Sequence, residues 1–376
     1  MIKILFVLGA RSEFGYILPV YMEAQARGHE PAIWACNTAS LAEYGNVARV
    51  AREQGLNVRQ IVNTSFDGFS TASMAKSVGA VTQSFVDFLS SETFDWVVVS
   101  GDRAEQLGAA VASSYTYVPT AHIQAGERSG NIDGLSRHAI ARLAHLHFAA
   151  NSDAHKRLIR TGEEAWRVVM SGAPQLDGLV DSASERNALV NKRIIPQHGY
   201  ILAIFHPETA GLDREQQLFS KLLCFLIGQD LPVVWIAPNN DAGASSLKKK
   251  VLTALRRKDF FHDNLSRADF AGVLALCEYV VGNSSVGIIE APSFKKVALN
   301  FGRRQDSRFQ GLNVINVTNP NVEMQEVFHL ANRRKNEIEA MPALDPYGDG
   351  NASARIVTAL EDLIVRPDLL LKQLTY

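Results

Sequence analysis

A polar stretch at residues 122–133, HIQAGERSGNID, carries residue types suited to proton transfer. It contains the carboxylates Glu127 and Asp133, and Arg137 and His138 follow within five residues. Carboxylates beside histidines and arginines suit general acid–base chemistry next to an anionic substrate. The stretch therefore predicts a catalytic site, with Glu127 and Asp133 as candidate acids or bases.

The flanking residues indicate where such a site would lie in the fold. VPTAHI, ending near His122, is typical of a buried strand, and apolar residues recur at three- and four-residue steps after Asp133, as in a helix. Open α/β sheets bind ligands at the carboxyl ends of their strands. Asp133 could instead be a simple helix cap, but a cap needs neither Glu127 nor His122.

Polar residues also follow several other predicted strands. The apolar run MIKILFVLGA precedes Arg11, and Arg11 could meet a phosphate or cap its own loop. FDWVVVSGDR, YILAIF and LPVVWIA are further buried runs that each end in polar residues. The candidates at these strand ends are Asp102, Arg103, His206, Asn239 and Asp241.

The segment GNSSVGIIEAP at 282–292 resembles an anion-binding turn. Gly282, Ser284 and Ser285 come just before a predicted helix, whose free N–H groups and dipole favour a phosphate. Glu290 could accept hydrogen bonds from two ribose hydroxyls, and Arg304 could bind a phosphate in bidentate fashion. Ser284 could equally be an ordinary N-cap.

Strands and helices alternate along the whole chain, which predicts parallel sheets built from βαβ units. We expect a first Rossmann-like domain at 1–178, rejoined by a C-terminal helix at 353–376, and a second at 179–352. The first strand–turn–helix lacks the three-glycine dinucleotide fingerprint. A nicotinamide cofactor is therefore not expected.

Composition excludes several classes of function. The net charge of −1 gives no general basic field for nucleic acid, and we interpret the basic helix at 248–257 as a solvated face. The three cysteines form no metal or disulfide pattern. The apolar N-terminus is too short for a membrane span, so we expect a cytoplasmic protein without membrane partners.

Short motifs in a fixed order resemble the hydrolysing UDP-N-acetylglucosamine 2-epimerases of the sialic-acid pathway. The pieces are RSEFG at 11–15, GDR at 101–103, HIQAGERSGNID at 122–133, RHAIARLAH at 137–145, FHPET at 205–209, PNNDAG at 238–243, GNSSVGIIEAP at 282–292 and GRRQ at 302–305. The resemblance implies a GT-B fold: two Rossmann-like domains with a nucleotide-binding cleft between them.

The family reaction eliminates UDP to give 2-acetamidoglucal and then adds water to give N-acetylmannosamine. The resemblance implies UDP contacts by Arg11, His206, Ser284, Ser285, Glu290 and Arg304, and acid–base roles for Asp102 and Asp133. His206 could also offset charge on the departing diphosphate. With these groups and helix N–H groups carrying that charge, neither a metal nor a cofactor is expected. We expect UDP and its sugar as partners, and a homo-oligomer, either a dimer or a tetramer.

One position departs from the family pattern. Many members have an acidic residue where this chain has Gln124, and Ala125 replaces a glycine. A glutamine cannot accept and return a proton as a carboxylate does, so Glu127 is expected to take over part of that role. Three functions stay open: a 2-epimerase acting on UDP-N-acetylglucosamine or on a diacetamido relative such as UDP-N,N'-diacetylbacillosamine, a glycosyltransferase of the same fold, and a UDP-sugar binding protein without catalysis.

Overall fold

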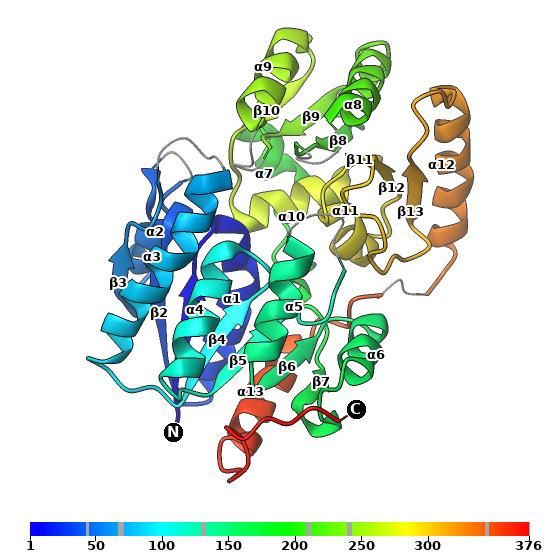
Figure 1. The fold of residues 1–376 in the computed structure, drawn as a ribbon. Helices are drawn as coiled ribbons and strands as arrows, with labels where there is room; N and C mark the ends of the chain where they lie inside the picture. Colours follow the sequence, from blue (N-terminus) through cyan, green and yellow to red (C-terminus); the bar gives the residue numbers. More distant parts are fainter. Residues whose placement is uncertain are drawn as a thin grey trace. The chain divides into compact units, whose positions relative to one another are not determined.

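The computed structural model describes residues 1–42, 45–66, 71–128, 133–207, 212–238, 243–342 and 346–375. These residues form two compact units (Figure 1). The first contains the chain up to Asp177 and returns from Tyr347 onward, and the second runs from Gly178 to Pro346.

The first unit is built on a parallel sheet of seven strands in the order β3-β2-β1-β4-β5-β6-β7. β1 is an apolar run whose alternate side chains enter two cores. Ile4, Phe6 and Leu8 pack on one face, whereas Leu5 and Val7 pack on the other. This is why the strand is apolar throughout instead of alternating with polar residues. The strands are β1 Lys3–Leu8, β2 Glu30–Cys36, β3 Val58–Val62, β4 Trp96–Ser100, β5 Thr120–Ile123, β6 Leu146–Ala149 and β7 Val168–Met170.

Helices cover both faces of this sheet. α1 belongs to the core that contains Ile4, and α3 and α4 belong to the core that contains Leu5. The helices are α1 Arg11–Ala26, α2 Val47–Glu53, α3 Thr71–Leu89, α4 Ala104–Tyr115, α5 Asp133–Leu143, α6 Ser152–Arg160 and α13 Ala352–Leu363.

The last helix, α13, belongs to the first unit although it follows the second in sequence. It packs against α1 and contributes Ile356, Val357 and Leu360 to the core. Its first turn is capped by Asp177, whose carboxylate accepts from the backbone N–H groups of Ala352 and Ser353 at 3.0 and 2.6 Å.

The second unit contains a parallel sheet of six strands in the order β10-β9-β8-β11-β12-β13. The strands are β8 Ile201–Ile204, β9 Val233–Ile236, β10 Phe260–His262, β11 Tyr279–Gly282, β12 Ala298–Phe301 and β13 Val314–Val317. The helices are α7 Arg186–Asn191, α8 Leu212–Ile227, α9 Ala244–Ala254, α10 Arg267–Leu276, α11 Val286–Ile289 and α12 Met324–Glu339.

Both sheets reverse their strand order once, and the reversal point is where such folds bind ligands. In the first sheet the reversal separates β1 from β4, so the loops beginning at Gly9 and Gly101 flank it. In the second it separates β8 from β11, so the loops after Ile204 and Gly282 flank it. Asp102, Arg103, His206, Ser284 and Ser285 lie in these loops, whereas Glu127 and Arg137 follow the neighbouring strand β5.

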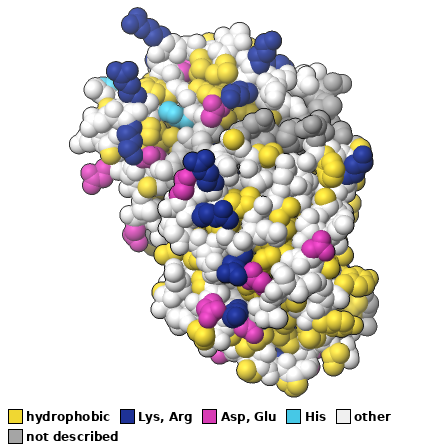
Figure 2. All heavy atoms as spheres, turned by 90° about the vertical axis from the view of Figure 1, so that its left-hand side faces the viewer, with side chains coloured by type: hydrophobic (Ala, Val, Ile, Leu, Met, Phe, Trp, Pro, Cys, Tyr) yellow, Lys and Arg dark blue, Asp and Glu magenta, His cyan; other side chains and the backbone are white. Residues whose placement is uncertain are grey.

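No helix of the described residues is long and apolar enough to cross a membrane. On the face drawn in Figure 2, basic and acidic side chains are interspersed among apolar and uncharged ones. This mixture agrees with the near-zero net charge of the chain.

Candidate functional site

Arg137 is the centre of the polar cluster in the first unit. Its guanidinium donates from Nη1 to Oε2 of Glu127 at 3.3 Å and from Nη2 to Oδ2 of Asp102. The Arg137 side chain is only 2% exposed, so its charge is shielded from water and compensated by these carboxylates. The helix α5 thus joins the loop after β4 to the loop after β5.

The two carboxylates on Arg137 differ in access to solvent. The Asp102 side chain is 18% exposed, whereas that of Glu127 is 1% exposed. The second oxygen of Glu127, Oε1, also accepts from Nδ2 of Asn151 at 3.0 Å. Glu127 therefore holds Arg137 in position, and Asp102 is the carboxylate that reaches toward solvent.

Asn151 is a residue that sequence reasoning missed. It is the N-cap of α6, where its Oδ1 accepts from the Ala154 N–H at 2.9 Å while its Nδ2 holds Glu127. An asparagine before a helix is normally interpreted as a cap alone. Only its contact with the distant Glu127 reveals the second role.

The loop from Gln124 to Glu127 has unusual backbone geometry. Gln124 has a φ of 57° and Gly126 a φ of 77°, both in the left-handed region. A Cβ atom at Gly126 would lie 2.7 Å from the carbonyl oxygen of Ala154, so only glycine fits there. Gln124 is buried, and its Nε2 has no hydrogen-bond partner among the described residues. The amide nitrogen of Gln124 therefore holds no carboxylate of the described residues in this structure.

His122 was expected to contact substrate, but the structure buries its side chain completely. Its Nε2 lies 2.7 Å from the carbonyl oxygen of Gly101, and burial lowers its pKa to about 3. His122 is therefore a neutral residue that ties β5 to the loop carrying Asp102.

The remaining candidates of the first unit are Arg11, Arg103, Asp133 and His138. Arg11 is exposed at the start of α1, and Arg103 donates from Nε to Oε1 of Glu105 at 2.8 Å. His138 is exposed, and faces a different pocket that is lined by arginines. Asp133 begins α5, but its side chain lies outside the described residues.

The second unit builds its site around Asn283, which the sequence reasoning also passed over. The Asn283 side chain is fully buried and bridges β11 to β8, because its Oδ1 accepts from the N–H of His206 at 2.7 Å and its Nδ2 donates to the His206 carbonyl at 2.8 Å. Gly282 has a φ of 140°, and a Cβ there would lie 1.9 Å from the Ile204 carbonyl oxygen. The two strand ends meet this closely only because residue 282 is glycine.

Arg304 and His206 lie in this neighbourhood as expected. Arg304 donates from Nη1 to the Asn283 carbonyl at 3.3 Å. Burial, and then the positive charge of Arg304, lowers the pKa of His206 well below its usual range. His206 is therefore neutral at pH 7, so the positive charge of this pair lies on Arg304.

The helix after Ser284 and Ser285 is shorter than the sequence predicts. α11 spans only Val286–Ile289 and continues as a 3-10 turn containing Pro292, which cannot donate in a helix. The expected helix dipole is correspondingly weak. Glu290 follows the last residue of α11 as its C-cap. Burial raises the pKa of Glu290 to about 7. Its Oε2 atom is buried without a hydrogen-bond partner among the described residues.

Two sequence candidates cannot be located. Asn239 and Asp241 lie outside the described residues. Among the described residues, no group of three or more His, Cys, Asp and Glu side chains could hold a metal ion.

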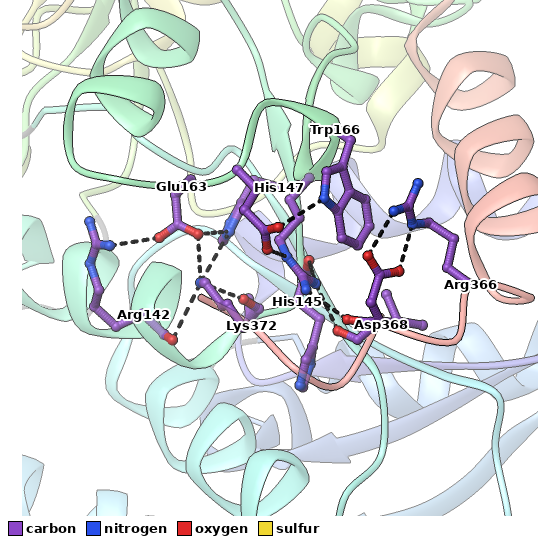
Figure 3. Close-up of polar contacts among 12 residues, drawn as sticks. Arg142, His145, His147, Glu163, Trp166, Arg366, Asp368 and Lys372 are labelled. Atoms are coloured by element: carbon purple, nitrogen blue, oxygen red, sulfur yellow. Dashed lines mark hydrogen bonds and ion pairs between the residues drawn. The ribbon is translucent and has the colours of Figure 1, made fainter. Parts of the chain in front are cut away.

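The C-terminal segment fixes the end of α5, the helix that carries Arg137. Lys372 donates to the carbonyls of Ala141 and Ala144 at 2.6 and 2.8 Å, and its Nζ lies 2.7 Å from Oε2 of Glu163 (Figure 3). Free carbonyls at a helix end favour a cation. Burial lowers the pKa of Lys372 to about 8. The C-terminal segment thereby supplies the C-terminal cap of α5.

Each unit by itself offers a distinct set of groups. In the first, the Arg137 guanidinium holds the solvent-accessible carboxylate of Asp102. In the second, Arg304, a neutral His206 and a Glu290 oxygen without a partner among the described residues suit an anion and hydroxyl groups.

The chain is similar to known proteins over most of its length. The sequence model of the family described as UDP-N-acetylglucosamine 2-epimerase matches residues 32–361. The chain is 30% identical to a UDP-N,N'-diacetylbacillosamine 2-epimerase (hydrolyzing) of Legionella pneumophila, with 98% of each chain covered. It is 28% identical to the polysialic acid biosynthesis protein P7 of Escherichia coli, over 97% of this chain and 95% of that protein.

Solved structures support the fold. The UDP-GlcNAc 2-epimerase from Neisseria meningitidis, bound to UDP-GlcNAc, matches with a TM-score of 0.79 at 19% identity, over 96% of this chain and all of that one. A UDP-N-acetylglucosamine 2-epimerase structure from Listeria monocytogenes gives the same TM-score over 97% of this chain and 96% of that one. The two parallel-sheet units therefore form a GT-B-like fold, which confirms the predicted fold class.

Proposed function

Because this chain belongs to the UDP-N-acetylglucosamine 2-epimerase family, we propose that it is a hydrolysing 2-epimerase that converts UDP-N-acetylglucosamine and water into UDP and N-acetylmannosamine. The observation that carries the proposal is Arg137, which holds Asp102 and Glu127 at the strand ends where ligands bind in this type of sheet. The hydrolysing relative from Legionella pneumophila, at 30% identity, supports the reaction type.

The proposed reaction has two steps. In the first, a base takes the proton on C2 of the sugar, the C1–O bond to the diphosphate breaks, and UDP leaves with the bonding electrons. A C1–C2 double bond forms, giving 2-acetamidoglucal. In the second, the oxygen of water bonds to C1 and a proton adds to C2 from the opposite face, which inverts that centre.

The second unit would bind the UDP portion. Arg304 would pair with a phosphate, and Glu290 would accept from the ribose hydroxyls through the oxygen that lacks a partner among the described residues. His206 is neutral and would act as a hydrogen-bonding group near the diphosphate. Ser284 and Ser285 would add hydroxyl donors to the phosphate.

The first unit would act on the sugar. Asp102 is the carboxylate best suited to move the C2 proton, because its side chain is the more exposed of the two on Arg137. Arg137 would keep Asp102 ionised and oriented through their ion pair. Glu127 would act on Arg137, not on substrate, since Arg137 and Asn151 occupy its carboxylate.

A second candidate substrate is UDP-N,N'-diacetylbacillosamine. It is named for the Legionella relative that is similar over nearly the whole chain. The chemistry at C1 and C2 would be the same, and the two substrates differ in groups at C4 and C6.

The test is to incubate the pure protein with each UDP-sugar and no acceptor, and to follow the products by NMR. Release of UDP together with a sugar inverted at C2 supports the proposal and identifies the substrate. Formation of an inverted sugar that is still attached to UDP would mean a non-hydrolysing epimerase. Turnover only after an acceptor is added would favour a glycosyltransferase, and binding without turnover would favour a non-catalytic UDP-sugar binding protein.

A further inference from the structure

A second pocket in the first unit is lined mainly by arginines. It has a volume of about 510 Å³, and Arg128, Arg142, Arg157 and Arg160 line it together with His138 and Asp153. α5 supplies two of these residues, α6 supplies three, and Arg128 follows the loop after β5. None of the arginines belongs to the proposed reaction.

The positive charges of this pocket are only partly compensated. Arg142 pairs with Glu163 at 2.9 Å, and Arg157 pairs with Asp153. Among the described residues, Arg128 and Arg160 form no ion pair. These two guanidiniums therefore line the pocket without an ion pair to any side chain that the structure describes.

The pKa of His138 is affected by the same positive charges. Its pKa is lowered by burial and then by the charges of Arg157, Arg137, Arg142 and Arg128. An imidazole among these guanidiniums stays neutral at pH 7 and offers either a donor or an acceptor. The pocket therefore keeps its cationic character without needing His138 to be protonated.

We propose that this pocket binds a small organic phosphate whose organic part is a sugar. Guanidiniums are the side chains that bind phosphate oxygens in pairs, and arginines on two helices surround the hollow. The pocket volume falls in the range of small-molecule sites and exceeds the need of a single inorganic ion. Among the described residues that line it there is no Phe, Tyr or Trp to stack on a nucleobase.

The pocket also lies next to the residues that position Arg137. Arg157 donates from Nη1 to the Gly126 carbonyl at 2.6 Å, and Gly126 precedes Glu127. A phosphate bound to Arg157 would therefore contact a side chain that holds the loop carrying Glu127. The binding itself does not depend on the proposed epimerase function.

The experiment is calorimetric titration of the whole protein with glucose 1-phosphate. Wild-type protein is expected to bind it with a dissociation constant below about 1 mM. Arg160→Ala and Arg128→Ala should each weaken binding at least about tenfold. Arg49→Ala, which removes an exposed arginine elsewhere on the same unit, should leave binding unchanged.

A parallel titration of Arg304→Ala identifies the site. If the sugar phosphate binds in the arginine pocket, Arg304→Ala binds it like wild type, and Arg160→Ala keeps normal melting and normal UDP binding. Binding that is lost in Arg304→Ala but kept in Arg160→Ala would assign the ligand to the second unit and overturn the proposal. Absence of binding to wild-type protein would overturn it as well, whatever the outcome for the epimerase reaction.

Discussion

Arg137 and Glu127 form an ion pair with 3.3 Å between Nη1 and Oε2, and each side chain is at most 2% exposed. Breaking a buried ion pair from one side leaves an uncompensated charge. Loss of this ion pair is therefore expected to lower both stability and turnover, because the same guanidinium also holds Asp102.

Glu127→Gln should destabilise the protein by about 3 kcal/mol, because Arg137 would lose a buried counter-charge while the amide keeps the shape of the side chain. Turnover should fall as well, since Arg137 would be freer to move away from Asp102. Chemical denaturation measures the first effect and single-turnover kinetics the second. Gln124→Glu is the matched variant on the same loop and should retain measurable activity. A silent Glu127→Gln would contradict the positioning role.

Arg304→Ala should weaken UDP binding by about 1.5–3 kcal/mol, the scale of a hydrogen bond to a charged group. Its guanidinium already lies against the Asn283 carbonyl beside the loop carrying His206. Calorimetry with UDP gives the value directly. An unchanged dissociation constant would remove Arg304 from the UDP site, and the exposed neighbour Arg303 provides the control substitution.

Glu13 should make stability depend on pH. Burial, and then the charge of Glu105, raises the pKa of Glu13 from 4.5 to about 8. The folded protein therefore holds a proton that the unfolded chain releases near pH 4.5, so this contribution to stability is full below pH 4.5 and is lost as the pH rises through 8. Glu13→Gln should flatten the fall in unfolding free energy between pH 5 and 8. Parallel curves for the two proteins would refute this.

Lys372→Met should shift α5 and cost about 2 kcal/mol of stability, since two helix carbonyls and Glu163 lose a charged donor. Because Arg137 lies on that helix, kcat should fall more than the affinity for UDP, which we propose binds to the second unit. Lys250→Met, an exposed lysine on α9, is the control. If kcat and the affinity for UDP fell equally in Lys372→Met, general unfolding would explain the result instead.

Much of the fold followed from local patterns. The apolar runs MIKILFVLGA and FDWVVVSGDR contain β1 and β4, because buried parallel strands are continuous apolar runs. β10, α7 and α12 were not anticipated. β10 has only three residues, and α12 carries polar residues over much of its surface, so neither gives a strong apolar signal.

The sequence predicted the charged residues of the candidate site, but it did not indicate the asparagines that hold them. Asp102, Glu127 and Arg137 were chosen for their chemistry, and the structure brings these three together. Asn151 and Asn283 were overlooked because a loop asparagine looks like a cap or a turn residue. Their roles depend on partners 24 and 77 positions away, which local sequence patterns do not reveal. The resemblance to the 2-epimerase family is confirmed by the family match.

The most direct test of the account follows deuterium at C2 of the sugar when wild-type protein and Asp102→Asn act on UDP-N-acetylglucosamine in heavy water. Wild type should release UDP and give N-acetylmannosamine carrying deuterium at C2, because the C2 proton leaves and a solvent proton replaces it. Asp102→Asn should bind UDP normally yet lose turnover and deuterium incorporation at least about 100-fold. Incorporation at the wild-type rate in Asp102→Asn, or product without deuterium from wild type, would contradict the proposed role of Asp102 in proton transfer.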